Sequence, residues 1–349
     1  MKSIYGYTRE KLQDFLQALG QKKFRGTQIY EWIYKRWATS FSEMTNINKD
    51  SLDELDKNFV FKFLEIETVQ ISSDGTRKYL FRLDDNNFIE TVLMRHNYGY
   101  SICVSSQVGC NMGCSFCASG LNKRQRNLET HEMVLQVLQV NNLLREEAIK
   151  VSHIVIMGIG EPFDNYDNVV DFIKIVNDPK GLEIGARHIT VSTCGIVPKI
   201  YEFSELSLQV NLAISLHFPN DELRSKHMPI NKAYGIDKLM EALNYYYQKT
   251  NRRITFEYIL LDGINDTIEI AAQLVKLIRG VNCYVNLIPM NATSGPLRRS
   301  TKKATDSFYN YLVKNGINVT LRHEHGHDID AACGQLRIKR EESKCEGKS

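Results

Sequence analysis

Three cysteines lie in one short stretch of the chain, at Cys110, Cys114 and Cys117. Their C-x3-C-x2-C spacing, with Gly109 and Gly113 allowing the backbone to curl, brings three thiolates onto one loop. Three thiolates can hold three irons of a [4Fe-4S] cluster and leave the fourth iron open. An open iron can chelate the amino and carboxylate groups of S-adenosylmethionine and pass an electron to its sulfonium. The loop therefore predicts chemistry that begins with a 5'-deoxyadenosyl radical.

A structural zinc site is the alternative for this loop, with Cys103 or His131 as the fourth ligand. Zinc loops usually carry C-x2-C pairs and close a tetrahedron of four donors. The present loop has a wider first spacing and offers three thiols, so its spacing favours the iron–sulfur cluster.

The elements around the loop have to bring distant residues to it. From about residue 98 onward, strand-like apolar runs alternate with helical patterns, and strands are expected at 102–105, 153–157, 189–192, 210–216, 254–261 and 285–288. This alternation predicts an α/β fold with a parallel sheet. Six such units fit a partial (β/α)6 barrel, and an open doubly wound sheet has the same rhythm. Both folds place chemistry at the carboxyl ends of the strands.

Two smaller units are expected before the barrel. Residues 1–62 carry apolar side chains at helical spacing, as from Leu12 to Leu19, and predict a small helical accessory domain. Residues 63–97 alternate like strands around a Ser-Ser-Asp-Gly turn, which predicts a β connector. The barrel core is expected at 98–349.

Polar residues follow several of the predicted strands and would converge at the mouth of a barrel. Gly158, Gly160 and Glu161 follow the second strand, where glycines let the backbone approach a ligand and a carboxylate can meet an ammonium group. The residues at the ends of later strands are Ser192, Ser215, Leu216, His217 and Asn291. Such residues are also common in ordinary turns, and Cys333, taken alone, is typical of an inert buried cysteine.

The composition points to a cytoplasmic protein. No apolar run is long enough for a signal peptide or a membrane span, so the eight cysteines are expected to bind metal or react and not to form a disulfide framework. A formal net charge of +3 does not by itself indicate nucleic-acid binding. Basic residues nevertheless gather locally, and the groups are Lys22, Lys23 and Arg25; Lys35 and Arg36; Lys123, Arg124 and Arg126; Arg298, Arg299, Lys302 and Lys303; and Arg337, Lys339 and Arg340.

The cysteine loop resembles the signature of the radical S-adenosylmethionine superfamily, and longer motifs narrow the resemblance to the RlmN-type adenine-C2 RNA methyltransferases. These motifs are Phe24-Arg25-Gly26 with Gln28 and Trp32, Ser72-Ser73-Asp74-Gly75, Cys103-Val-Ser-Ser-Gln-Val-Gly-Cys110, Met157-Gly-Ile-Gly-Glu161-Pro162, Met228-Pro-Ile-Asn231, Asn286-Leu-Ile-Pro-Met-Asn291 and Asp328-Ile-Asp-Ala-Ala-Cys333-Gly-Gln-Leu336. They occur in the order of the family and span nearly the whole chain. One departure is Ala292 after Asn291, where the family often has proline.

The resemblance implies a role for each candidate residue. Cys110, Cys114 and Cys117 would ligate the [4Fe-4S] cluster. The expected S-adenosylmethionine contacts are Gly160, Glu161, Ser192, Ser215, Leu216, His217 and Asn291.

The resemblance also implies a covalent route through Cys333. One S-adenosylmethionine would methylate this thiol, and a second would be cleaved to the radical that removes hydrogen from the S-methyl group. The carbon radical would then add to adenine C2, which is too electron-poor for direct attack on a sulfonium. Cys103 would release the product through a transient disulfide with Cys333, and Glu90 would accept the proton. Cys194, Cys283 and Cys345 match no motif and are interpreted as bystanders.

The implied substrates are an adenosine in the peptidyl-transferase centre of 23S rRNA and an adenosine beside the anticodon of tRNA. The implied partners are these RNAs and an electron donor such as flavodoxin or ferredoxin, with no membrane. The closest alternative is a Cfr-type enzyme that methylates adenine C8 of 23S rRNA and confers antibiotic resistance. An alternative of another class is a non-catalytic, zinc-containing RNA-binding protein.

Overall fold

The computed structural model describes residues 1–120, 123–290, 296–323, 325–326 and 328–329. Among the predicted site residues, Asn291 and Cys333 lie outside these ranges, as does Cys345. The strands of the main sheet are β3 (Glu65–Ile71), β4 (Arg77–Arg82), β5 (Phe88–His96), β6 (Gly99–Cys103), β9 (Val151–Ile156), β10 (Ile189–Thr193), β11 (Asn211–Ser215), β12 (Ile254–Leu260), β13 (Cys283–Pro289) and β14 (Val319–Leu321).

The 10-stranded sheet has the order β14-β13-β12-β11-β10-β9-β6-β5-β4-β3. The strands from β6 to β14 are parallel, and those from β3 to β6 pair antiparallel. The parallel strands follow one another in a single direction, whereas a doubly wound sheet reverses its strand order at a switch point. The partial barrel is therefore confirmed and the doubly wound alternative is wrong.

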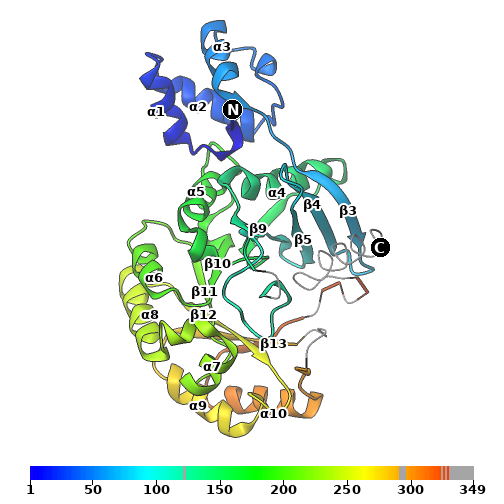
Figure 1. The fold of residues 1–349 in the computed structure, drawn as a ribbon, viewed down its shortest axis with the longest axis vertical. Coiled ribbons are helices and arrows are strands. Elements are labelled where there is room, and N and C mark those ends of the chain that lie inside the picture. Colours follow the sequence, from blue (N-terminus) through cyan, green and yellow to red (C-terminus); the bar gives the residue numbers. More distant parts are fainter. Residues whose placement is uncertain (121–122, 291–295, 324, 327, 330–349) are drawn as a thin grey trace.

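Helices cover the outer face of the parallel strands (Figure 1). They are α4 (Thr130–Leu143), α5 (Tyr166–Asn177), α6 (Val197–Ser204), α7 (Asp221–His227), α8 (Ile236–Thr250), α9 (Ile268–Ile278) and α10 (Lys302–Lys314). Side chains alternate along each strand. On β9, Ile154 and Ile156 are buried in the main apolar core, whereas Val155 faces the inner cavity of the barrel.

The N-terminal residues form a small helical unit at one end of the molecule (Figure 1). It contains α1 (Arg9–Ala18), α2 (Lys23–Tyr34) and α3 (Lys49–Asn58), with β1 (Lys2–Ser3) paired parallel to β2 (Phe59–Val60). The unit contacts α5 through an ion pair of Lys11 with Asp171 and a 3.3 Å hydrogen bond from the Tyr30 hydroxyl to the Ile175 carbonyl. The accessory helices are therefore packed on the barrel.

The predicted β connector does not stand apart from the barrel. Strand β5 pairs with β6 from Val92↔Cys103 to His96↔Gly99, so the connector hairpin continues the barrel sheet. Strand β14 was not predicted from the sequence and adds one more parallel strand beside β13. Within the described ranges, no helix is both long and apolar enough to cross a membrane.

Candidate functional site

The cysteine loop leaves the sheet after β6 and is closed at its base by a two-stranded ribbon. In this ribbon β7 (Gln107–Val108) pairs antiparallel with β8 (Arg126–Asn127). Gly109 and Gly113 both have positive φ angles, 76° and 64°, which residues with side chains rarely adopt. The expectation that these two glycines let the loop curl is confirmed.

Side chains other than cysteine hold the loop in place. The Ser115 hydroxyl lies 2.8 Å from Nδ1 of His227 at the end of α7, and the Ser115 N–H donates to the His227 carbonyl at 3.0 Å. The Phe116 ring packs edge-to-face against His217 with ring centroids 4.8 Å apart. The middle of the loop is therefore docked on residues that follow β11.

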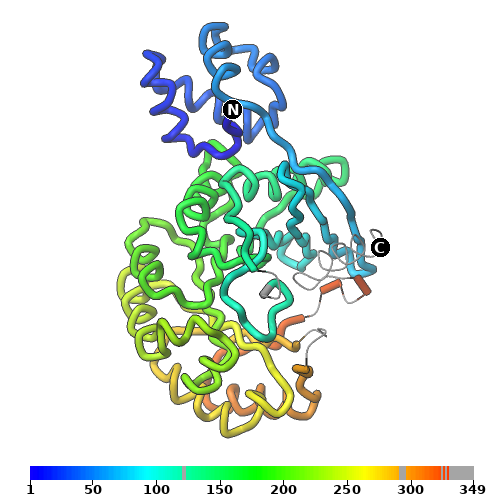
Figure 2. Tube along the Cα trace, viewed as in Figure 1, coloured from blue at the N-terminus to red at the C-terminus, as the bar shows by residue number. Residues whose placement is uncertain are grey.

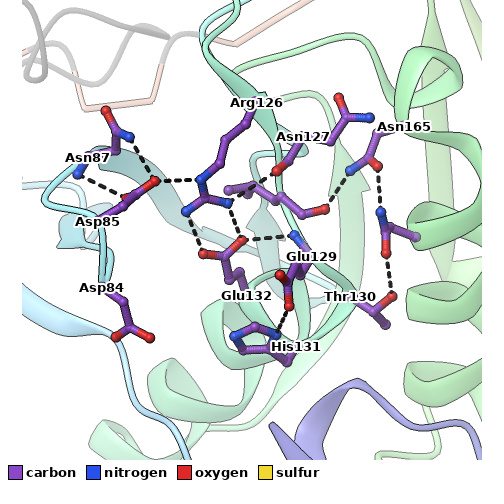
Figure 3. Close-up of polar contacts among 12 residues, drawn as sticks. Asp84, Asp85, Asn87, Arg126, Asn127, Glu129, Thr130, His131, Glu132 and Asn165 are labelled. Carbon is purple, nitrogen blue, oxygen red and sulfur yellow. Dashed lines mark hydrogen bonds and ion pairs between the residues drawn. The ribbon is translucent and has the colours of Figure 1, made fainter. Parts of the chain in front are cut away.

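The exit of the loop is tied to the connector and to α4 by Arg126 (Figure 3). Its guanidinium donates to Asp85 at 2.5 Å and to both carboxylate oxygens of Glu132 at 2.7 and 2.8 Å. The hydrogen bond from Arg126 holds the pKa of Asp85 at about 2, so the contact is ionised at neutral pH. A bidentate arginine–carboxylate pair also fixes geometry, and this one joins the loop to two neighbouring elements.

The three thiols form a donor set that suits an iron–sulfur cluster. Burial raises the pKa of Cys110 to about 12, with smaller contributions from Cys117 and Glu161. Burial also raises the pKa of Cys114, where Cys117 and Cys110 contribute further, so the three sulfurs lie within electrostatic range of one another. Iron–sulfur clusters are held by cysteine thiolates, so these thiols would lose their protons when a cluster binds.

The two residues considered as a fourth zinc ligand lie on other elements. Among the described residues, no three His, Cys, Asp or Glu side chains, the three loop cysteines included, are arranged to share one metal ion. Cys103 ends β6, and His131 lies on α4, where its Nδ1 is 3.1 Å from a Glu129 carboxylate oxygen. Neither is placed by the structure as a fourth donor for the loop.

The turn after β9 approaches the base of the loop closely. Gly160 has a φ of +113°, and a Cβ there would lie 2.6 Å from Cβ of Gln107 and 2.7 Å from Oγ of Ser106. The Gln107 side chain also accepts a hydrogen bond from the Glu161 N–H at 2.8 Å. Glycine is therefore required at position 160 for the turn and the loop to pack.

Glu161 is buried and bridges two strand ends. Its carboxylate accepts the Phe163 N–H at 2.9 Å and the Cys194 N–H at 2.8 Å, which ties the turn after β9 to the end of β10. Burial raises the pKa of Glu161, and the backbone hydrogen bond from Cys194 opposes that shift. The carboxylate lies within electrostatic range of Cys110 and Cys114, beside the cluster loop.

The residues predicted at the ends of β10 and β11 are brought together. The hydroxyl oxygens of Ser192 and Ser215 are 3.5 Å apart. His217 has a φ of +57°, and its Nδ1 accepts the Ile259 N–H at 3.0 Å. Burial, with a smaller effect of Arg224, lowers the pKa of His217 to about 3. The ring is therefore neutral, with its proton on Nε2.

Arg224 is a central residue of this region that the sequence did not reveal. It is fully buried and donates to the carbonyls of Cys194 at 2.6 Å and Leu216 at 3.3 Å and to Oδ1 of Asn231 at 2.8 Å. Its helix, Asp-Glu-Leu-Arg-Ser-Lys-His, reads as a solvent-exposed segment, so no pattern marked this arginine. Arg224 fixes the ends of β10 and β11 relative to each other.

Cys194 was interpreted as a bystander, but it is adjacent to the predicted site. It is buried, its N–H is held by Glu161, and it packs in an apolar cluster with Phe218, Met228 and Met290. Cys114 and Phe116 pack against the same cluster. Cys194 is therefore part of the wall beside the cluster loop.

Glu90 and Cys103 lie on the same face of the sheet. Val92 pairs with Cys103, and Glu90 stands two residues before Val92, which places its side chain on that face. Cys103 is buried with Val92, Met94 and Val155. Met94 and Val155 also line the inner cavity of the barrel, so the predicted resolving thiol lies beside that cavity.

Glu90 is a buried carboxylate inside a strand. It lies within β5, is 4% exposed, and forms an ion pair with fully buried Lys78 of β4 at 3.0 Å. A buried carboxylate remains charged only when it is paired. Lys78 was missed because the pairing crosses a hairpin.

Comparisons with known proteins bear on the family and the fold of this chain. Residues 104–275 match the family model of the radical SAM superfamily, and residues 2–60 match that of the ribosomal RNA large subunit methyltransferase N-terminal domain. The chain is 55% identical to a probable dual-specificity RNA methyltransferase RlmN of Shouchella clausii, with 98% of each chain covered. It is 56% identical to the protein of the same name from Geobacillus kaustophilus, with 97% and 93% covered.

A solved structure shows the same fold. The crystal structure of a radical SAM methyltransferase from Sphaerobacter thermophilus superposes with a TM-score of 0.89 at 42% identity, covering 96% of this chain and 99% of that one. The chain belongs to the RlmN family of RNA methyltransferases within the radical SAM superfamily.

Proposed function

We propose that this enzyme methylates C2 of an adenosine in the peptidyl-transferase centre of 23S rRNA and of an adenosine beside the anticodon of tRNA. The curated relatives are named dual-specificity RNA methyltransferases, which supports two RNA substrates. The enzyme works in the cytoplasm, where these RNAs are found, and takes electrons from a small carrier such as flavodoxin or ferredoxin.

The observation that carries the proposal is the shared sheet face of Glu90 and Cys103 beside the cluster loop. Cys110, Cys114 and Cys117 would hold a [4Fe-4S] cluster, which would supply the electron for cleavage of S-adenosylmethionine. Two molecules of this cofactor are used in each turnover, one of them to methylate Cys333.

The protein residues then act in sequence on the substrate. Cys333 presents the carbon that attacks the adenine, and Glu90 removes the proton from C2 of the adduct. Cys103 attacks the sulfur of Cys333 and breaks its bond to the transferred carbon, which takes up a proton to become the methyl group. The two cysteines are left as a disulfide, and the unpaired electron of the adduct passes to the oxidised electron carrier. The residues that bind S-adenosylmethionine are Gly160, Glu161, Ser192, Ser215, Leu216, His217 and Asn291.

The accessory helices offer a surface for RNA. On α2, Phe24 is 49% exposed and Arg25 lies over its ring at 5.0 Å, while Arg36 lies over the Trp32 ring at 4.2 Å. Aromatic and arginine side chains of this kind stack on unpaired bases. We assign this face to contact with folded RNA while the target base is turned into the barrel.

The test is product analysis of digested RNA by mass spectrometry, with C2- and C8-methyladenosine standards. The proposal requires C2-methyladenosine from both 23S rRNA and tRNA, and C8-methyladenosine instead would identify a Cfr-type activity. Cys333→Ala should abolish product and keep the iron content of the purified protein. Normal product from that variant would refute the covalent route.

A further inference from the structure

The chain returns from the last strand of the sheet to the connector hairpin through residues that follow β14. We call the described residues of this segment the strap: Arg322, His323, His325, Gly326, Asp328 and Ile329. At its start, the Arg322 N–H donates to the Leu287 carbonyl of β13 at 2.8 Å. At its end, the strap meets the β3–β4 turn, at the opposite edge of the sheet (Figure 2). The strap therefore joins the two edges of the open barrel.

Two carboxylates, one from each side, make the contact at the turn. Asp328 accepts hydrogen bonds from the Ser72 hydroxyl and from the Ser73 N–H, the latter at 3.0 Å. Asp74 accepts the Gly326 N–H at 2.9 Å and also the Thr76 N–H at 2.8 Å within its own turn. The hydrogen bonds from Ser72 and Ser73 hold the pKa of Asp328 at about 2, so this carboxylate is ionised at neutral pH. Hydrogen bonds to ionised acceptors are about twice as strong as neutral ones.

Aromatic rings fix the middle of the strap. His325 packs edge-to-face against His96 of β5, with ring centroids 4.7 Å apart, and His323 lies 5.2 Å from His325. All three histidines line a cavity of about 1080 Å³ on the inner face of the sheet. The strap is thus part of the wall of the barrel interior.

Cys333 follows the strap by four residues, counted from Ile329. It lies outside the described residues, but the covalent chain limits its distance from the strap. Cys333 is five residues from the anchored Asp328, and five residues span at most about 18 Å when fully extended. An anchor at Asp328 therefore limits how far the Cys333 thiol can move from this edge of the sheet.

We propose that Ser72 and Asp328, assisted by Asp74, are positioning residues that lock the strap to the β3–β4 turn and so keep Cys333 within reach of its reaction partners. This inference rests on the proposed function, because it requires Cys333 to carry the methyl group. That thiol has to meet a methyl donor, an adenine and the Cys103 thiol in turn, and a restricted approach raises the rate of each encounter. On this view, the Ser72-Ser73-Asp74-Gly75 motif and the motif that begins at Asp328 supply the two sides of the same contact.

A matched pair of variants at position 72 separates positioning from general stability. Ser72→Thr keeps the hydroxyl that Asp328 accepts, and Ser72→Val has nearly the same shape without it. The experiment measures four quantities on the full-length holoenzyme: the rate of C2-methyladenosine formation, the fraction of Cys333 methylated by intact-protein mass, iron per chain, and the Kd for S-adenosylmethionine.

We expect Ser72→Val to form product about tenfold more slowly than Ser72→Thr. This factor corresponds to the free energy of about one hydrogen bond to a charged group. Iron content and cofactor Kd should be equal in the two variants. Asp328→Asn should give a similar loss, and the double variant Ser72→Val/Asp328→Asn should be no slower than the slower single variant, because both changes break one contact.

Equal product rates for Ser72→Val and Ser72→Thr would overturn the inference. A loss of iron and cofactor binding in proportion to the rate would also overturn it, since the contact would then be a general structural one. A failure of the proposed function is distinguishable, because the wild-type enzyme would then form no C2-methyladenosine at all.

Discussion

The buried ion pair between Lys78 and Glu90 should contribute to stability and to catalysis in ways that can be separated. Lys78 is fully buried, Glu90 is 4% exposed, and their charged atoms are 3.0 Å apart. Lys78→Met fills most of the same volume but leaves a buried carboxylate without its counter-charge. Removing one partner of such a pair costs about 3–5 kcal/mol, which lowers the melting temperature of a protein of this size by roughly 4–7 °C.

A double variant separates the effect of this pair on stability from its effect on catalysis. The double variant Lys78→Met/Glu90→Gln removes both charges, and most of the lost stability should return because no unpaired ion remains. It should nevertheless form no C2-methyladenosine, because the proposed proton acceptor is absent. Thermal unfolding and product analysis on the same preparations provide both readouts.

The matched control is Lys62→Met, which makes the same substitution in the exposed pair of Lys62 with Asp84, 2.7 Å apart. Exposed pairs contribute less than about 1 kcal/mol, so this variant should melt close to the wild type. If Lys78→Met were no less stable than Lys62→Met, the reasoning about the buried pair would be wrong.

Three further predictions concern the loop and the cofactor residues. Gly160→Ala should weaken the binding of S-adenosylmethionine, measured by calorimetry, and leave the iron content of the protein unchanged. The new Cβ would lie 2.6 Å from Cβ of Gln107, so the turn has to shift. Unchanged affinity would contradict this prediction. Because the pKa of His217 is about 3 in the fold and 6.5 normally, the unfolded chain binds an extra proton between those pH values. The free energy of unfolding should therefore fall with decreasing pH across that window by up to about 1.4 kcal/mol per unit, with a shallower slope in His217→Asn. Chelation of iron should leave the far-ultraviolet circular dichroism unchanged, because Ser115 and Phe116 hold the loop through protein contacts; loss of helix signal would disprove that independence.

The parallel strands could be predicted from the sequence because their apolar runs are short, rich in β-branched residues and separated by helical patterns. Strand β14 was missed because its three residues, Val319–Leu321, are too few to show a period. The union of connector and barrel was also missed. It depends on the pairing of β5 with β6, and long-range pairing leaves no local signal in a single sequence.

Candidate site residues could be named from the sequence where type and spacing suffice, as with the three loop cysteines, whose role as cluster ligands stays a prediction. A residue that acts through burial could not be named in this way. Arg224 stands in a charged helical segment, and its contacts with the carbonyls of Cys194 and Leu216 exist only after β10 and β11 are adjacent. Lys78 likewise gains its role from a hairpin register that places it diagonally across from Glu90.

The continuity of the sheet fixes Glu90 relative to the cysteine loop. Strand β6 ends at Cys103, and the cluster loop begins within the same run of residues, while β5 beside it carries Glu90. Backbone hydrogen bonds thus fix Glu90 relative to the loop, with no hinge between connector and barrel. Sites on strands are held more precisely than sites on loops. Cys333, the proposed carrier of the methyl group, lies outside the described residues, and the contact between Asp328 and Ser72 lies five residues before it along the chain.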